Sequence, residues 1–177
     1  MGSGPGAVCA ISLNTILTQE QQALYQDPEC IRDLLNSSRT IAIVGLSAER
    51  QKASYFVATY LQREGYRIIP VNPRGGKILG ETVYPDLRSI PEQVDLVDVF
   101  RPAAEVPTIV DQALAIRAKA LWMQLRIIHF EAAETARAAG LTVVMDRCIK
   151  MEHGRYSGSL HWAGMNTELI SARRARR

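Results

Sequence analysis

The chain is poor in the residues from which metal sites and disulfide frameworks are built. Its 177 residues include three cysteines, Cys9, Cys30 and Cys148, and three histidines, none of them paired at the spacing of metal ligands. Three widely separated cysteines suit neither a disulfide-stapled domain nor a zinc site. We therefore expect no metal centre and a reducing, cytoplasmic environment.

The sequence also lacks a long apolar run. No stretch approaches the ~18 consecutive apolar residues that a membrane helix needs, and residues 1–6 are polar and rich in glycine, unlike a secretory leader. The composition, 47% hydrophobic and 22% charged, is that of an ordinary globular protein. We expect a single domain with a real hydrophobic core and no membrane association.

A strong charge of one sign is missing as well. The formal net charge is +3, but the arginines at 173, 174, 176 and 177 supply four positive charges, so the remainder of the chain is close to neutral. A basic tail can contact nucleic acid. A run this short is more typical of a solvated chain end, so we do not expect nucleic acid as a partner.

What the sequence does contain is a regular alternation of apolar strands and amphipathic helices. Residues 41–44 form an apolar run that ends in Gly45, as in a strand buried on both faces. This alternation predicts an α/β fold, a Rossmann-like doubly wound, mostly parallel sheet flanked by helices in a single domain. We expect strands at 41–44, 66–71, 94–100, 120–125 and 141–146, and helices at 53–64, 104–119 and 131–139.

The segments outside this alternation have weaker patterns. Thr18 with Gln21 forms a capping-box pattern, and Asp27 followed by Pro28 is a strong helix start. The connection 72–93 is dense in glycine and proline, with a short strand expected at 82–84, and residues 150–177 show no clear periodicity. We expect an N-terminal extension at 1–26, the Rossmann-like domain at 27–153 and a C-terminal extension with the basic tail at 154–177.

The first strand-to-helix turn is the first candidate site. Ligands of open parallel sheets bind beyond the carboxyl ends of the strands, where the strand order reverses. Gly45 allows a sharp turn, Ser47 offers a hydroxyl and an N–H, and Lys52 and Ser54 stand at the helix start, where phosphate is favoured. The turn has one glycine, so it is not the G-x-G-x-x-G fingerprint. It is equally compatible with a plain turn that binds nothing.

The end of the second strand narrows the choice of ligand. NAD sites place a carboxylate there to hold the ribose hydroxyls, whereas this strand continues into Asn72, Pro73, Arg74 and, three residues on, Lys77. Cations at this place favour a nucleotide with a phosphate on its ribose, either NADP or coenzyme A. Coenzyme A fits better, because the glycine fingerprint of NADP enzymes is missing and the chain has little room for a substrate domain.

Several ordered motifs then add a family resemblance. The chain contains "IAIVGLS", "GYRIIPVNPR", "ILGETVYPDLRSIP", "VDLVDVFRPAAEVP", "WMQL" and "GLTVVMDRCIKMEH". Over residues 27–153 it resembles the small stand-alone CoA-binding proteins, which are similar to the CoA-binding domain of the succinyl-CoA synthetase alpha subunit. The resemblance implies a Rossmann-like CoA-binding domain whose cofactor lies across the carboxyl ends of the strands.

The resemblance also implies roles for individual residues. Gly45, Ser47 and Lys52 would form the phosphate turn, and Gln124 would lie near the pantetheine arm. The adenosine and its 3′-phosphate would be bracketed by Val71, Asn72, Pro73 and Arg74. A wall near the adenine or pantetheine would come from Phe100, Arg101 and Pro102. Core packing is an equally good explanation for Phe100 and Trp122.

Two positions near the pantetheine end need separate treatment. The family pattern has glycine where this chain has Arg126, and glycine there suggests close backbone approach or a positive φ. We expect the arginine side chain to narrow the channel or to contact phosphate. Cys148 is flanked by Arg147 and Lys150, which would lower the pKa of a reactive thiol; the alternative is a packed, inert cysteine.

These patterns favour a binding module over an enzyme. The synthetases that contain this domain use a phosphorylated histidine from another domain, and neither His129 nor His161 lies in such a context. We expect a cytoplasmic protein that holds coenzyme A or an acyl-CoA, as a homo-oligomer or beside an acyl-CoA-using partner. The alternatives are a thiol–disulfide redox protein that uses Cys148 on CoA, and an NADP-dependent oxidoreductase.

Overall fold

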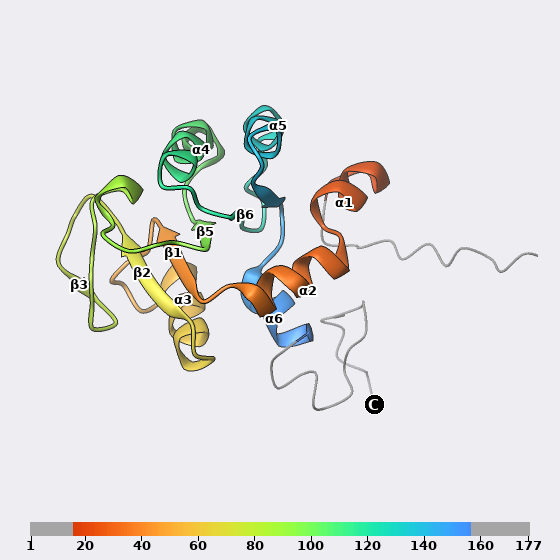
Figure 1. Cartoon of the computed structure of the whole chain (residues 1–177). Helices are drawn as coiled ribbons and strands as arrows, with labels where there is room; N and C mark the ends of the chain where they lie inside the picture. The colour runs from red at the N-terminus through yellow and green to blue at the C-terminus, as the bar shows by residue number, and fades with distance from the viewer. Residues whose placement is uncertain (1–15, 157–177) are drawn as a thin grey trace, which may run out of the picture.

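The core of the protein is one parallel β-sheet. The computed structural model describes residues 16–156 (Figure 1). The strands of the main sheet are β1 (Thr40–Val44), β2 (Arg67–Val71), β5 (Leu96–Val99), β6 (Ala120–Met123) and β7 (Thr142–Val144). Their order is β2-β1-β5-β6-β7, and every pair is parallel. The predicted Rossmann-like, doubly wound sheet is therefore confirmed.

Helices cover both faces of this sheet because the chain winds outward from β1 in two directions. One face packs against the first, fourth and fifth helices, and the other against the second, third and sixth. Figure 1 shows α4 and α5 on one side of the strands and α2, α3 and α6 on the other. The helices are α1 (Gln19–Tyr25), α2 (Pro28–Ser37), α3 (Ala53–Arg63), α4 (Val106–Ala115), α5 (Phe130–Ala138) and α6 (Ile149–Tyr156).

The two N-terminal helices begin where the sequence predicts. Thr18 and Gln21 form both bonds of a capping box at α1, and Asp27 caps α2 by accepting a hydrogen bond from the Cys30 N–H at 2.7 Å. The buried Gln26 between the helices donates from Nε2 to the Met145 carbonyl at 2.9 Å. This bond fastens the helical pair to the segment that follows β7.

The predicted strands and helices are present, with differences at their ends. Helix α4 starts later than expected, because a 3-10 turn, η2 (Ala103–Glu105), precedes it. The connection after β2 contains the hairpin of β3 (Lys77–Ile78) and β4 (Glu81–Thr82), a parallel bridge between Val71 and Tyr84, and the 3-10 turn η1 (Leu87–Ser89). The short strand expected at 82–84 thus forms one residue earlier.

Helix α6 is the element that hydrophobic periodicity misses. It buries Glu152, His153 and Arg155 together with Ile149. A buried face of this kind is polar, and its side chains are paired with one another, so no apolar stripe appears in the sequence.

The remaining structural expectations concern the chain as a whole. Within residues 16–156, no helix is long and apolar enough to cross a membrane. Cys30 and Cys148 are free thiols. Cys9, His161 and the basic tail lie outside the described residues.

Candidate functional site

The strand order reverses between β1 and β5, and a cleft lies at that point. Its volume is about 270 Å³. Four of the predicted site residues line it together, namely Gly45, Val71, Pro73 and Arg101. Thr108 from the first turn of α4 also lines it. The sequence therefore predicted correctly that these loops converge on one place.

Gly45 is required by the geometry of the turn. Its φ is +87°, and a Cβ built there would lie 2.7 Å from both the Phe100 carbonyl oxygen and the Arg101 Cδ. The Gly45 N–H donates to the Val71 carbonyl at 2.8 Å, and the Phe100 N–H donates to the Val44 carbonyl at 2.8 Å. The turn is thus pressed against both neighbouring strand ends, where only glycine fits.

The hydroxyls of both serines accept hydrogen bonds from backbone N–H groups of this turn. The Ser47 N–H donates to Ser54 Oγ at 3.1 Å, and the Glu49 N–H donates to Ser47 Oγ at 3.1 Å. Ser54 is buried, so its hydroxyl shapes the turn and does not face an open phosphate site. Lys52 is the exposed N-cap residue of α3 and has no side-chain capping bond.

Asn72 ties the second loop to the first. Its Nδ2 donates to the Leu46 carbonyl at 3.0 Å, and its Oδ1 accepts from the Arg74 N–H at 3.0 Å. Pro73 and Arg74 are exposed beyond it. Asn72, where an NAD site would have a ribose-binding carboxylate, therefore links the two loops and orients the segment that carries Arg74.

The third loop supplies the other wall of the cleft. Arg101 is exposed and forms a two-bond ion pair with Glu105, at 2.8 and 2.7 Å. Pro102 is exposed, and Phe100 is half-buried against the core on the α3 side of the sheet. Phe100 therefore fits the core-packing explanation, while Arg101 faces the cleft.

Gln124 lies away from the cleft and reveals a buried acid that sequence reasoning missed. Its Nε2 donates to Asp98 Oδ1 at 2.8 Å, and both side chains are buried. Burial raises the pKa of Asp98 to about 7, against the opposing effects of the Gln124 bond and the Val99 N–H. Among residues 16–156, Asp98 Oδ2 has no hydrogen-bond partner. The available signal was an aspartate inside the apolar strand "VDLVDVF".

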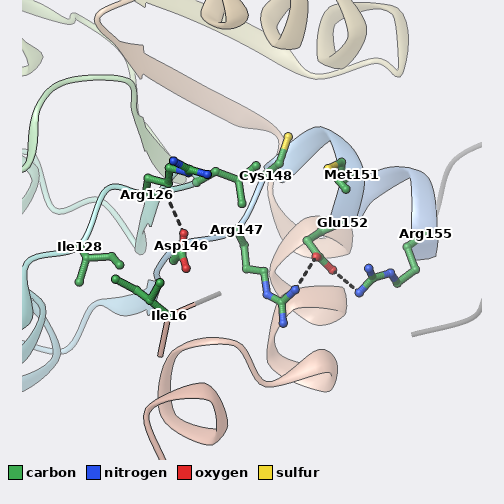
Figure 2. A pocket seen from close by; sticks show the side chains of 10 residues that line it. Ile16, Arg126, Ile128, Asp146, Arg147, Cys148, Met151, Glu152 and Arg155 are labelled. Atoms are coloured by element: carbon green, nitrogen blue, oxygen red, sulfur yellow. Dashed lines mark hydrogen bonds and ion pairs between the residues drawn. The ribbon is translucent and has the colours of Figure 1, made fainter. Parts of the chain in front are cut away.

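A larger cavity, of about 720 Å³, lies at the carboxyl ends of β6 and β7 (Figure 2). Leu125, Arg126, Asp146 and Cys148 line it, together with residues of α6. Arg126 has φ +64°, and its N–H donates to Asp146 Oδ1 at 2.6 Å. The expectation that glycine at this position would mark a positive φ is confirmed, although the residue here is arginine.

Cys148 does not have the surroundings of an activated thiol. Burial raises its pKa, and the nearby Asp98 adds to the rise. Lys150 lies over the Phe56 ring at 4.3 Å, and Arg147 pairs with Glu152 at 3.7 Å. Of the two alternatives for Cys148, the raised pKa fits the packed cysteine and not the activated thiol, because burial outweighs the flanking cations.

His153 is a packing residue. Its Nδ1 lies 2.9 Å from the Tyr60 hydroxyl, and its ring meets the edges of Tyr60 and Tyr66. Burial lowers the pKa of His153. In residues 16–156, no group of three or more histidine, cysteine or acidic side chains is placed to hold a metal ion.

The parallel sheet, the reversal of strand order and the cleft at that reversal define a Rossmann-like α/β domain. More particularly, the chain belongs to the CoA-binding domain family. The model of this family, described as "CoA binding domain", matches residues 39–154. The match includes all the residues that line the cleft and those of the larger cavity except Ile16 and Arg155.

Two relatives illustrate the range of this similarity. The protein YneT of Bacillus subtilis (strain 168) is 37% identical over 123 residues, covering 70% of this chain and 91% of YneT. Acetate–CoA ligase [ADP-forming] II of Archaeoglobus fulgidus is 31% identical over 106 residues. That match covers 59% of this chain and 15% of the ligase, so the similarity extends to one portion of a much longer protein.

Solved structures of similar sequence have the same fold. A hypothetical protein from Pyrococcus horikoshii OT3 is 36% identical, with a TM-score of 0.71 over 73% of this chain and 91% of that chain. A protein from Thermus thermophilus is also 36% identical, with a TM-score of 0.71 over 73% of this chain and 98% of the other. Both are small proteins that this chain nearly spans.

The buried carboxyl of Asp98 predicts a pH dependence of stability. Asp98 keeps its proton up to about pH 7 in the folded protein but ionises near pH ~4 in the unfolded chain. Between these values the unfolded chain binds fewer protons, so the free energy of unfolding falls as the pH rises. We expect Asp98 to contribute a fall of about 2–3 kcal/mol between pH 5 and pH 8.

Asp98→Asn should remove that contribution while preserving an acceptor for Gln124. Urea denaturation of both proteins at pH 5 and pH 8 measures the difference, and Asp111→Asn, at an exposed position, serves as the control. Equal pH dependence in the wild type and Asp98→Asn would contradict a raised pKa at Asp98.

The positive φ of Arg126 predicts a stabilising substitution. Arg126→Gly should raise the free energy of unfolding by about 0.5–1 kcal/mol, because glycine adopts this conformation without the cost paid by other residues. The bond to Asp146 uses the backbone N–H and is retained. Arg126→Ala keeps the Cβ and should give no such gain; a similar gain in both variants would show that the side chain, not the backbone, is responsible.

Proposed function

We propose that the protein is a binding module for coenzyme A or an acyl-CoA, without a catalytic domain of its own. The nucleotide would lie in the cleft between the ends of β1 and β5. The pantetheine arm would run along the carboxyl edge of the sheet toward β6 and β7. Parallel strands are spaced by roughly 4.8 Å, so this edge offers a continuous path for a long, flexible chain.

The observation that carries the proposal is the combination of a glycine turn with the end of β2, where residues 72–74 carry a cation, Arg74, and no carboxylate. Gly45 brings the backbone to the cleft without a side chain, and Asn72 fixes the loop from which Arg74 projects. Arg101 contributes a guanidinium to the cleft wall, where it is paired with Glu105. This arrangement suits a ribose that carries a phosphate and disfavours NAD, which needs a carboxylate at this place.

The relatives support the same ligand. The family is described as a CoA-binding domain, and one relative is by name a CoA ligase. In that ligase the similar portion is a small part of the chain, which is consistent with a module that presents CoA to other catalytic parts. A cytoplasmic location and a CoA-using protein partner, or self-association, belong to this proposal.

The thiol–disulfide alternative loses its main support. It required an activated Cys148, whereas burial raises the pKa of this thiol. The NADP-dependent alternative has no support from the family match. We therefore retain the binding module alone.

The role of Arg74 gives a direct test by calorimetry. The protein should bind CoA more tightly than dephospho-CoA, NADP or NAD. Arg74→Ala should weaken CoA binding by about tenfold, because an ionic hydrogen bond to the 3′-phosphate is lost. It should change dephospho-CoA binding by less than about twofold, since that ligand lacks the phosphate.

Arg88→Ala is the matched control, because Arg88 is also an exposed loop arginine but lies in the 3-10 turn η1. It should leave both affinities unchanged. Tighter binding of NADP than CoA, or no binding of CoA at all, would refute the proposed function. An equal loss for CoA and dephospho-CoA in Arg74→Ala would place the 3′-phosphate elsewhere.

A further inference from the structure

The cavity at the ends of β6 and β7 is a second site on the same edge of the sheet. Its volume, about 720 Å³, exceeds the 270 Å³ of the cleft at the reversal. Leu125 and Arg126 line it from the segment after β6, and Asp146 and Arg147 from the segment after β7; residues of α6 also line it. None of its lining residues belongs to the cleft.

The charged side chains of this cavity are predominantly cationic. Three guanidinium groups, of Arg126, Arg147 and Arg155, face two carboxylates, of Asp146 and Glu152. Figure 2 shows Arg147 and Arg155 reaching Glu152 from its two sides, at 3.7 and 3.1 Å. One buried carboxylate thus serves two arginines, and a third arginine remains at the rim.

Within the described part of the chain, Arg147 and Arg155 each have an unpaired hydrogen-bond donor. The Nε atoms of Arg147 and Arg155 are buried and have no hydrogen-bond partner among residues 16–156. Arg155 as a whole is only 8% exposed. A buried donor without an acceptor costs free energy, and the arginines of the cavity outnumber its carboxylates by one. An anion bound in the cavity would balance this excess positive charge.

The rest of the lining is apolar. Ile16, Leu125, Ile128 and Met151 surround the charged groups. A pocket with apolar walls and a cationic floor matches a short hydrocarbon chain that ends in a carboxylate. Phosphate alone would leave the apolar walls without contacts.

We propose that this cavity is an acyl pocket that selects acyl-CoAs with a negatively charged end, such as dicarboxylic acyl groups. The inference rests on the proposed function, because the CoA moiety would deliver the acyl group from the cleft past Gln124. The guanidinium groups of Arg155 and Arg126 would hold the terminal carboxylate, and the apolar side chains would contact the methylene groups. The free dicarboxylate offers the same chemistry from another source.

Calorimetry with matched acyl pairs tests the proposal. Malonyl-CoA and succinyl-CoA are compared with propionyl-CoA and butanoyl-CoA, which have the same number of acyl carbons and no terminal charge. The charged member of each pair should bind about tenfold more tightly, as expected for a hydrogen bond to a charged group. Free succinate, titrated alone, should bind far more weakly than succinyl-CoA.

Substitutions of the cavity arginines test whether the cavity causes the preference for a charged acyl group. Arg126→Gln, at an exposed position, and Arg155→Gln should each reduce the preference for the charged acyl group while leaving the affinity for CoA unchanged. Arg117→Gln, at an exposed position outside the cavity, is the control. Should Arg155→Gln fail to fold, as judged by circular dichroism, Arg126→Gln alone still decides the outcome.

The results separate this inference from the proposed function. Equal binding of charged and neutral acyl-CoAs, with CoA itself bound, overturns the acyl pocket and leaves CoA binding intact. Succinate binding as tight as that of succinyl-CoA also overturns it, because the cavity would then be a site for a free anion. Failure of every CoA compound to bind removes both.

Discussion

The reversal of strand order between β1 and β5 is the constraint on which the rest of the structure depends. Because all five strands are parallel, their carboxyl ends share one edge, and the crossovers on either side of the reversal leave to opposite faces. A cleft opens where they part, and Gly45 lets the first turn close against Phe100. The cleft and the larger cavity both lie at this one edge.

The carboxyl edge is supported by polar groups buried beneath it. Asp98 and Gln124 form one pair inside the sheet, and Glu152 with its two arginines forms a second group between β7 and α6. Burial of such groups costs free energy unless they are paired. Burial raises the pKa of Asp98. Among residues 16–156, Asp98 Oδ2 and the Nε atoms of both arginines have no hydrogen-bond partner.

The sequence predicted the fold well because the strands are apolar runs and the helices facing them have simple amphipathic stripes. It also predicted the meeting of Gly45, Val71, Pro73 and Arg101, since parallel strand ends must converge. The sequence-based prediction failed where polar side chains are buried. Helix α6 and Asp98 carry charged side chains into the core, and only the three-dimensional pairing explains them. The sequence left two readings of Cys148 open, because it shows the neighbouring charges but not the burial that raises the pKa of this thiol.

The central claim is that coenzyme A lies along the carboxyl edge, and amide NMR shifts during a CoA titration test it most directly. The account predicts large shifts in the turns 45–47, 72–74 and 100–102 and in the segment 124–126. Amides at the opposite edge, such as Thr40, Arg67 and Lys119, should stay unchanged. Shifts concentrated at that opposite edge, or no saturable shifts, would contradict the account.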